Sequence, residues 1–289
     1  MPELTDLSVI RTLCEKYDFA LSKGFGQNFI INPGLPPKIV DASGVDKSWG
    51  VLEIGPGIGP LTQQLGLRAA KVCAVEVDTR LAPILGKTVG EFPNVEILWG
   101  DVLKQDIRAL VAEKFPGLRP MACANLPYYI TTPILSALLE ADCFDAVTVM
   151  VQKEVAQRIA AAPGTGDYGA FSVFCQYYTE PELLFDVPPS CFLPQPKVTS
   201  AVVTLRRRTE RPWDVADQDI FFRVVRSSFA MRRKKLSNGL ASGFPELGKQ
   251  GAEDVLRVCG FPENVRGETL GIPEFALIAN EIVRRREAK

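Results

Sequence analysis

The sequence predicts a doubly wound α/β sheet followed by a small all-helical domain. Two observations carry this prediction. Short apolar runs recur through residues 1–208 with helix-length amphipathic segments between them, and after Arg208 helical periodicity continues without a convincing strand. The first five runs are apolar throughout rather than alternating, as expected of parallel strands that helices cover on both faces.

Six segments have the composition of strands, and four of the stretches between them are long enough for crossover helices. In such a sheet, a ligand site is expected outside the carboxyl ends of the strands, where the strand order changes direction. The predicted strands are Val51–Ile54, Lys71–Val77, Val95–Trp99, Met121–Ala124, Ala146–Val151 and Ser200–Leu205. The predicted helices are Pro60–Arg68, Thr79–Gly90, Leu103–Lys114 and Thr132–Ala141.

The change of pattern divides the chain into a sheet domain, residues 1–208, and a helical domain, residues 209–289. Apolar residues in the second domain recur at helical spacing, as Phe221, Val224, Val225 and Phe229 do. The first helices of this domain carry most of the basic residues discussed below.

The composition restricts the chemistry open to the protein. A chain of 289 residues that is 46% hydrophobic can bury a core large enough for one or two domains. It contains no histidine, which excludes Ser-His-Asp and Cys-His catalysis and every histidine-containing zinc site. Its seven cysteines include no C-x-x-C pair, and we expect them to be buried free thiols.

Hydropathy gives no reason to expect a membrane protein. No run reaches the ~20 uninterrupted apolar residues of a membrane-spanning helix. The first residues, Met1 to Phe19, are too charged for a signal peptide. We therefore expect a cytoplasmic protein without a membrane partner.

The charge of the chain is unevenly distributed. The net charge is -1, yet the segment from Lys197 to Lys235 contains eleven basic and four acidic residues, which leaves an excess of seven positive charges. This asymmetry favours a polyanion bound on one side of the protein. A solvated helix face that is basic by chance is the alternative.

A glycine-rich turn and two acidic residues follow three consecutive predicted strands. Gly55, Gly57 and Gly59 allow the backbone to turn tightly and to approach a ligand without a Cβ in the way. Their G-x-G-x-G spacing is not the G-x-G-x-x-G of dinucleotide sites. Glu76 ends the next strand, where a carboxylate can accept hydrogen bonds from both ribose hydroxyls of a nucleoside cofactor. Asp101 closes the third strand, where it can contact the adenine of that cofactor. This layout resembles that of class I S-adenosylmethionine methyltransferases.

The fourth strand ends in Asn125-Leu-Pro-Tyr128, which is the most specific motif in the chain. The lone pair of an adenine N6 is delocalised into the ring, so an enzyme must localise it. The Asn125 side-chain oxygen and the Leu126 carbonyl can each accept one N6 hydrogen and favour a pyramidal nitrogen. Pro127 restricts Leu126 to an extended conformation, and Tyr128 offers a face on which a base swung out of its stack can lie. This chemistry requires no metal and no titrating base.

These motifs resemble those of the bacterial small-subunit (16S) rRNA adenine-N6,N6-dimethyltransferases, or dimethyladenosine transferases, relatives of the erythromycin-resistance methyltransferases. The resemblance implies a class I methyltransferase Rossmann-like fold and extends from about Lys23 to the C-terminal helix. Its motifs are Gly26-Gln-Asn-Phe29, Leu52-Glu-Ile-Gly-Pro-Gly57, Asn125-Leu-Pro-Tyr-Tyr129, Met150-Val-Gln-Lys-Glu-Val-Ala156, Phe192-Leu-Pro-Gln-Pro-Lys-Val198 with Ser200-Ala-Val-Val203, and Phe229-Ala-Met-Arg-Arg-Lys234.

The resemblance implies that residues 1–208 bind S-adenosylmethionine and catalyse methyl transfer. Phe192 matches an aromatic position that stacks the target base opposite Tyr128 in related adenine methyltransferases, although core packing explains a phenylalanine equally well. The implied cofactor contacts are Asn28 and Ile30 with the methionine end, beside Gln27; Gly55 with the cofactor backbone; Glu76 with the ribose; Asp101 with the adenine; and Asn125 with both cofactor and target amine.

We assign RNA binding to residues 209–289. Position 235 is lysine where the family commonly has threonine, which adds charge to an expected RNA-facing helix. The candidate RNA-binding residues are Arg223, Arg226, Arg232, Arg233, Lys234 and Lys235. By resemblance, the product is N6,N6-dimethyladenosine at two adjacent adenosines in the loop of the 3'-terminal hairpin of 16S rRNA, in the immature 30S subunit. No motif encodes an oligomeric state, and we expect a monomer.

Three alternatives stay open at the level of sequence. A DNA adenine methyltransferase or a large-subunit rRNA methylase can use the same fold, because phosphate contacts carry no sequence information. The second alternative is an RNA-binding ribosome assembly factor whose catalytic activity is dispensable. A nicotinamide-dependent oxidoreductase is disfavoured by the glycine spacing.

Overall fold

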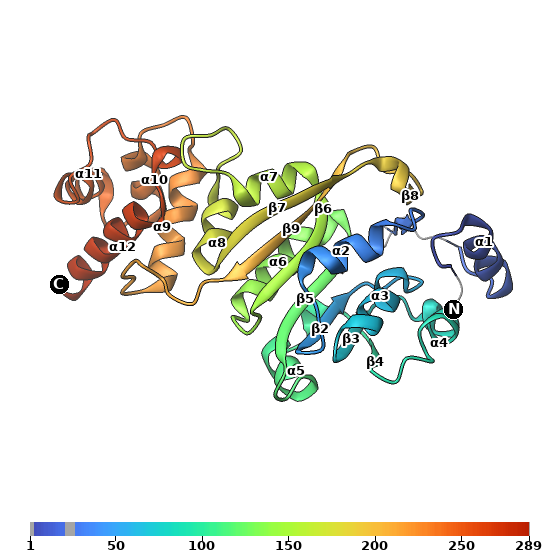
Figure 1. Cartoon of the computed structure of the whole chain (residues 1–289). Coiled ribbons are helices and arrows are strands. Elements are labelled where there is room, and N and C mark those ends of the chain that lie inside the picture. The colour runs from blue at the N-terminus through green and yellow to red at the C-terminus, as the bar shows by residue number, and fades with distance from the viewer. Residues whose placement is uncertain (1–2, 21–26, 289) are drawn as a thin grey trace. The chain divides into compact units, whose positions relative to one another are not determined.

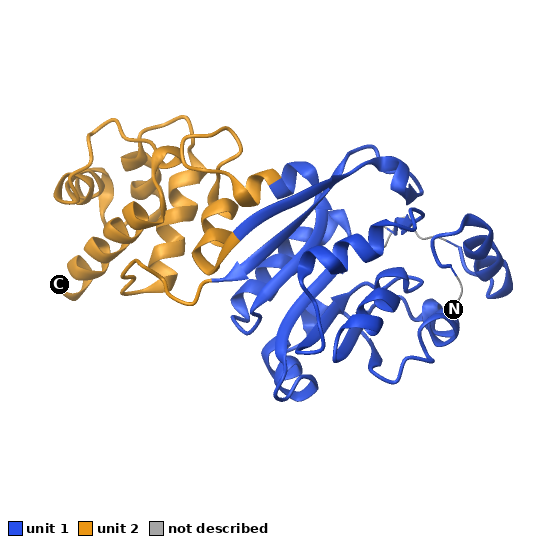
Figure 2. Ribbon diagram, viewed as in Figure 1, with its two compact units in different colours: residues 1–156, 181–207 blue, residues 157–180, 208–289 orange. Residues whose placement is uncertain are grey.

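The computed structural model describes residues 3–20 and 27–288 (Figure 1). The chain forms two compact units, one of residues 1–156 and 181–207, the other of residues 157–180 and 208–289 (Figure 2). The sequence-based boundary after residue 208 assigned residues 157–180 to the first domain, whereas the structure groups them with the second unit. Packing of aromatic rings explains this grouping, because the Phe174 ring lies 5.4 Å from that of Phe222.

The first unit is built on a seven-stranded sheet whose strand order is β4-β3-β2-β5-β6-β9-β7. Strand β2 pairs in parallel with β3 and β5, β3 pairs in parallel with β4, and β5 pairs in parallel with β6. Strands β6 and β9 are antiparallel. All six predicted strands are confirmed, with small shifts at their ends. The strands are β2 (Trp49–Ile54), β3 (Lys71–Glu76), β4 (Val95–Trp99), β5 (Arg119–Asn125), β6 (Ala146–Gln152), β7 (Thr179–Val187) and β9 (Ser200–Arg207).

Strand β7 was not predicted. It forms one edge of the sheet, and its residues are partly exposed rather than continuously buried. Glu180, Pro181 and Glu182 interrupt the apolar run by which central strands were recognised. A proline and charged side chains are tolerated at such an edge because one side of the strand needs no hydrogen bond to a neighbour. A second sheet of two short strands pairs β1 (Phe29–Ile30) with β8 (Phe192–Leu193).

Helices cover both faces of the large sheet. Helices α2 (Leu35–Ser43) and α3 (Pro60–Arg68) share a buried core with Val51, Val72 and Met121. Gly50, one residue before Val51, points to the opposite face, where a Cβ would lie 2.4 Å from the ring of Phe115. Phe115 ends α5 (Ile107–Lys114), and α6 (Thr131–Glu140) follows β5. The predicted helix Thr79–Gly90 is a short 3-10 helix, η2 (Thr79–Leu81), followed by α4 (Ala82–Thr88).

The amino-terminal segment packs on this unit. Asp6 caps α1 (Leu7–Lys16) by accepting hydrogen bonds from the amides of Ser8 and Val9. Ile10 and Leu13 on α1 belong to a buried cluster that also contains Phe29. The first helix therefore contributes apolar surface next to the start of β1.

The second unit is helical, and the described residues after Arg207 contain no strand, as predicted. Two of its helices approach closely at a glycine: a Cβ on Gly239 would lie 2.4 Å from the carbonyl oxygen of Ser227 on the neighbouring helix. Helix α7 (Lys153–Ala160) begins in the first unit. The other helices are α8 (Ala170–Tyr178), α9 (Gln218–Ala230), α10 (Leu236–Gly243), α11 (Gly248–Val258) and α12 (Ile272–Glu287).

Candidate active site

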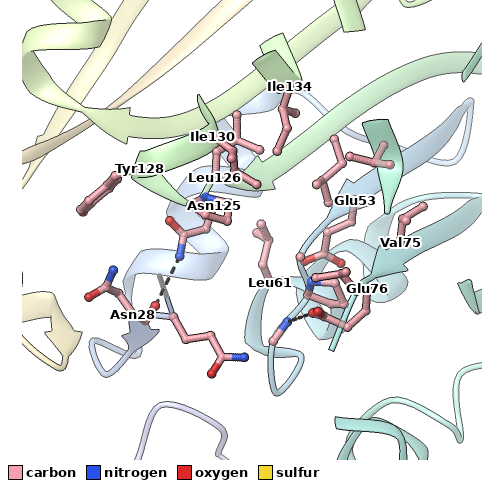
Figure 3. A pocket seen from close by; sticks show the side chains of 18 of the residues that line it. Asn28, Glu53, Leu61, Val75, Glu76, Asn125, Leu126, Tyr128, Ile130 and Ile134 are labelled. Atoms are coloured by element: carbon pink, nitrogen blue, oxygen red, sulfur yellow. Dashed lines mark hydrogen bonds between the residues drawn. The ribbon is translucent and has the colours of Figure 1, made fainter. Parts of the chain in front are cut away.

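A cavity of about 340 Å³ opens at the carboxyl ends of β2, β3 and β5 (Figure 3). The strand order changes direction there, since β3 and β4 lie on one side of β2 and β5 and β6 on the other. Open α/β sheets bind ligands at this point, and the volume is that of a small-molecule site. Nine predicted site residues line the cavity: Asn28, Ile30, Gly55, Glu76, Asp101, Asn125, Leu126, Pro127 and Tyr128.

The glycine-rich turn forms the floor of this cavity after β2. Gly55, Gly57 and Gly59 have φ angles of 68°, 60° and 96°, a left-handed backbone that other residues adopt only with strain. A Cβ on Gly57 would meet the ring of Phe29 at 3.6 Å, and Phe29 lines the same cavity. The turn thus brings backbone rather than side chains to the ligand.

Glu76 and Asp101 lie at the ends of β3 and β4, where the sequence placed them. The Glu76 carboxylate accepts hydrogen bonds from the amides of Gly57, at 3.3 Å, and Asp78, at 2.9 Å. Burial raises the pKa of Glu76, and these backbone hydrogen bonds oppose the rise. Asp101 caps the short helix η3 (Val102–Lys104) through the amide of Leu103, so it is a cap as well as a cavity residue.

Asn125 is oriented by the segment that precedes the first strand. Its side-chain nitrogen donates a long hydrogen bond of 3.5 Å to the carbonyl oxygen of Asn28 (Figure 3). No described residue donates to the Asn125 side-chain oxygen. The contact fixes which end of the amide is left as an acceptor.

The residues after Asn125 hold a second acceptor. The Leu126 amide donates to the carbonyl oxygen of Met150 at 3.1 Å, and the Leu126 side chain is buried. Its own carbonyl oxygen accepts no hydrogen bond from the described part of the chain. The Pro127 carbonyl accepts from the hydroxyl of Thr131 at 3.0 Å, which fixes the turn into α6.

Tyr128 is anchored at its hydroxyl. The phenol oxygen lies 2.6 Å from the hydroxyl of Ser200 on β9. Burial raises the pKa of Tyr128, and the hydrogen bond with Ser200 opposes this rise. The ring is therefore held in one orientation at the cavity.

Phe192 is the one predicted base-binding residue that the structure does not bring to the cavity. Its side chain is 2% exposed and lies in the core with Ile39 and Val202. It pairs across the two-stranded sheet with Ile30, which does line the cavity. In this structure Phe192 supports the wall beneath Ile30 rather than facing a ligand.

One further polar residue at the cavity, Glu53, was not selected from the sequence. Glu53 on β2 is 1% exposed, and neither its Oε2 nor the neighbouring Thr62 hydroxyl makes a hydrogen bond of ordinary geometry with the described residues. Burial raises the pKa of Glu53 to about 8; Thr62 opposes the rise and the charge of Glu76 adds to it. A buried acid inside an apolar strand was the available signal, since such groups are rare unless functional.

Gln27 was expected beside Asn28, and it is held by the end of β3. Its side-chain nitrogen donates to Asp78 at 3.0 Å, and Asp78 also accepts two hydrogen bonds from the Arg80 guanidinium and one from the Arg80 amide. The hydrogen bond from Arg80 lowers the pKa of Asp78. This network ties the segment before β1 to the wall of the cavity. Gly26, the first residue of that motif, lies outside the described residues.

The basic cluster of the second unit separates into two groups. Arg223 donates to the Gly243 carbonyl at 2.7 Å and lies 4.3 Å over the ring of Phe244. Arg232 donates to the Gly166 carbonyl at 3.0 Å and lies 3.5 Å from Glu268. The other four candidates are exposed, and their side chains make no ion pair or hydrogen bond with a described residue: Arg226, Arg233, Lys234 and Lys235.

The expectation that Lys235 lies on a helix with the preceding basic residues, an RNA-facing one, was wrong. Helix α9 ends at Ala230, because Met231 leaves the helical conformation with φ -129° and ψ 54°. Residues 231–234 form a turn, and Lys235 is the N-cap residue that precedes α10. The basic residues from 232 to 235 therefore lie on a connection between two helices.

Neither a metal centre nor a membrane span is found in the described ranges. Within residues 3–20 and 27–288, no group of three or more cysteine, aspartate or glutamate residues could hold a metal ion. In the same ranges, every helix is too short or too polar to cross a bilayer.

Comparison with known proteins identifies the family of this chain. A sequence model of the family described as ribosomal RNA adenine dimethylase matches residues 19–266. The chain is similar to ribosomal RNA small subunit methyltransferase A of Alkaliphilus oremlandii, with 44% identity over 286 residues, 99% of this chain and 100% of the relative. It is 48% identical over 273 residues to the protein of that name from Listeria monocytogenes serovar 1/2a, covering 93% of this chain and 92% of the relative.

Solved structures agree with the fold. A dimethyladenosine transferase from Plasmodium falciparum has a TM-score of 0.76 and 26% identity, covering 89% of this chain and 98% of that one. The 23S rRNA methyltransferase ErmE has a TM-score of 0.66 and 27% identity, covering 89% and 100%. The fold class and the resemblance predicted from the sequence are confirmed. The chain belongs to the ribosomal RNA adenine dimethylase family and is an S-adenosylmethionine-dependent rRNA adenine dimethyltransferase.

Proposed function

We propose that the protein dimethylates N6 of two adjacent adenosines in the loop of the 3'-terminal hairpin of 16S rRNA, within the immature 30S subunit. The proposal includes action in the cytoplasm and as a monomer. Relatives that match nearly the whole chain are named ribosomal RNA small subunit methyltransferase A, which favours the small subunit over the large one. ErmE, named as a 23S rRNA methyltransferase, is less similar in sequence, at 27% identity.

The single observation that carries the chemistry is the orientation of Asn125. Its nitrogen is committed to the Asn28 carbonyl, which leaves its oxygen to accept one N6 hydrogen of adenine. The Leu126 carbonyl is the second acceptor, on the adjoining residue. Two acceptors side by side draw both hydrogens out of the ring plane and localise the nitrogen lone pair, and these hydrogen bonds strengthen as the nitrogen becomes cationic.

The residues of the cavity fit S-adenosylmethionine. This cofactor supplies an electrophilic methyl group when it is bound. The buried Oε2 of Glu53 lacks a hydrogen-bond donor, as expected of a group that accepts from the methionine ammonium. Glu76 would hold the ribose hydroxyls and Asp101 the adenine, while Gly55 presents backbone that no Cβ obstructs. Asn28, Ile30 and Gln27 would border the methionine end.

Tyr128 provides the face for the target base in this proposal. Its anchored ring lines the cavity beside the two acceptors. Stacking on an aromatic ring repays part of the cost of removing a base from its loop. Phe192 is left out of the proposed base contacts because it is buried.

Phosphate contacts are proposed for the second unit. Arg226, Arg233, Lys234 and Lys235 are exposed cations whose charge no described acid neutralises. Such side chains supply most of the affinity for a nucleic-acid backbone. Arg223 and Arg232 are held by acceptors within the unit, so their first role is to fix its helices.

Mass spectrometry of adenosines tests the proposal. Small subunits lacking the modification are incubated with the enzyme and S-adenosylmethionine, beside naked 16S rRNA, large-subunit RNA and duplex DNA. Dimethyladenosine in the terminal hairpin alone supports the assignment, and modification of large-subunit RNA or DNA instead would contradict it. The assembly-factor alternative is tested by Asn125→Ala, which should still bind immature subunits if binding is a separate role.

A further inference from the structure

Tyr129 is the most exposed large apolar side chain of the described residues, at 58%, and it lines the cavity. Its phenol ring makes no hydrogen bond or ring contact with any described residue. Exposed tyrosines of this kind, with a rigid and amphipathic ring, are typical of recognition surfaces.

The backbone that carries Tyr129 is fixed. The residue lies in the short 3-10 helix η4 (Tyr128–Ile130), directly after the two proposed acceptors. The Ile130 amide and the Thr131 hydroxyl both donate to the Pro127 carbonyl, at 3.3 Å and 3.0 Å. The ring therefore has a defined starting point next to the reacting centre.

Tyr128 and Tyr129 cannot share one base. Successive side chains of a 3-10 helix point about 120° apart. Tyr128 is turned toward β9, where its hydroxyl meets Ser200. Tyr129 faces another direction and, although it lines the cavity, is largely exposed, so it is available to a group at the edge of the cavity rather than to the base beside Tyr128.

We propose that Tyr129 is a stacking platform for the nucleobase next to the target adenosine. This inference rests on the proposed function. A base that swings into the cavity leaves its neighbour in the loop without a stacking partner. The ring of Tyr129 replaces that partner, and a purine gains more from it than a pyrimidine because its stacking surface is larger. Tyr129 then selects an adenosine with a purine beside it.

The test combines protein and RNA substitutions. Tyr129→Ala, Tyr129→Phe and the wild type are assayed on small subunits whose hairpin carries both adenosines, or uridine in place of either one. Tyr129→Ala should lower kcat/KM for the subunit about tenfold, mainly through KM, as expected for the loss of one stacking contact. Tyr129→Phe should recover most of that loss, because the ring remains.

The decisive result is coupling between the two changes. In the wild type, uridine on the side that faces Tyr129 should slow methylation of the remaining adenosine several-fold. In Tyr129→Ala, the same uridine should not slow methylation any further. The dissociation constant of S-adenosylmethionine should stay within twofold. Leu67→Ala is the matched control, since Leu67 is 48% exposed, lies near the end of α3 just before β3 begins, and does not line the cavity.

Several outcomes would overturn the inference while the proposed function stands. They are an unchanged kcat/KM in Tyr129→Ala, equal losses of kcat/KM in the alanine and phenylalanine variants, and weaker cofactor binding. A fourth is that Tyr129→Ala lowers kcat/KM by the same factor whether the neighbouring base is adenine or uracil. Failure of the wild type to modify any small subunit would instead overturn the proposed function, and the inference would fall with it.

Discussion

The side-chain nitrogen of Asn125 donates to the main-chain oxygen of Asn28, 97 residues earlier in the chain. This contact joins the end of β5 to the segment before β1. It also orients the amide: with its nitrogen turned toward Asn28, the Asn125 oxygen lies on the other side and is left as an acceptor.

Replacement of Asn125 should separate catalysis from folding. Asn125→Ala removes one of two acceptors for the N6 hydrogens, and kcat should fall by about a hundredfold or more. Asn125→Asp should also be impaired, because a carboxylate cannot donate to the Asn28 carbonyl. Single-turnover methylation of small subunits gives the rates, with Asn264→Ala, at an exposed position of the second unit, as the control. Full turnover by either Asn125 variant would refute the assigned role.

Glu53 should make stability depend on pH. Its folded-state pKa of about 8 lies above the ordinary value of 4.5, so the folded protein holds a proton that the unfolded chain releases. The stabilisation from this proton is complete below the unfolded pKa and is lost as the pH rises toward 8, at up to about 1.4 kcal/mol per pH unit. Relative to Glu53→Gln, the wild type should lose free energy of unfolding between pH 5 and pH 8 in urea titrations. Parallel pH profiles for the two proteins would show that Glu53 keeps an ordinary pKa.

Two glycines of neighbouring elements should respond in opposite directions to alanine. Gly59 has φ 96°, and a Cβ there would lie 2.7 Å from Val89, so Gly59→Ala should lower the free energy of unfolding by about 1–3 kcal/mol. Gly86 is exposed within α4 and has open space around it, so Gly86→Ala should raise it by about 0.5–1 kcal/mol. Chemical denaturation measures both. A stabilising Gly59→Ala would mean that the turn tolerates an ordinary backbone.

The two groups of basic residues should differ in what their loss affects. Alanine at Arg226, Arg233, Lys234 and Lys235 together should weaken binding to small subunits and lower the salt dependence of log K by roughly 0.7–0.9 per lost phosphate contact. Stability should change little, because these side chains are exposed and unpaired with described residues. Arg223→Ala should instead lower the unfolding midpoint, since it removes contacts with Gly243 and Phe244. Filter binding over a salt series, with thermal unfolding, distinguishes them; an unchanged salt slope in the quadruple variant would exclude these phosphate contacts.

Sequence patterns were sufficient for the central sheet and for the ends of its strands. Apolar runs identified β2 to β6 and β9. The residues that follow β2, β3, β4 and β5 line the cavity because these parallel strands end at one edge. Strand β7 was missed because an edge strand does not need a continuous apolar run. The grouping of residues 157–180 with the second unit depends on ring packing between α8 and α9, as between Phe174 and Phe222. Local sequence patterns do not reveal a contact between residues so far apart in the chain.

The side-chain environment could not be read from residue types alone. A phenylalanine at position 192 fits a base-stacking role and a core role equally well, and only its burial distinguishes them. Six basic residues looked alike in the sequence, yet carbonyls and acids from other segments hold Arg223 and Arg232. Glu53 stood inside a recognised motif, but its protonation follows from the apolar surroundings that the folded sheet creates.

Phe29 links the amino-terminal helix to the site of the methyl donor. Its ring borders the cavity, and it also belongs to the apolar cluster that contains Leu4, Ile10 and Leu13. A protein trimmed by its first 16 residues would retain every residue that touches the ligand, yet one wall of the pocket would lose its backing. If such a shortened enzyme bound the methyl donor more weakly, the cause would be lost packing behind Phe29 and not a missing ligand contact.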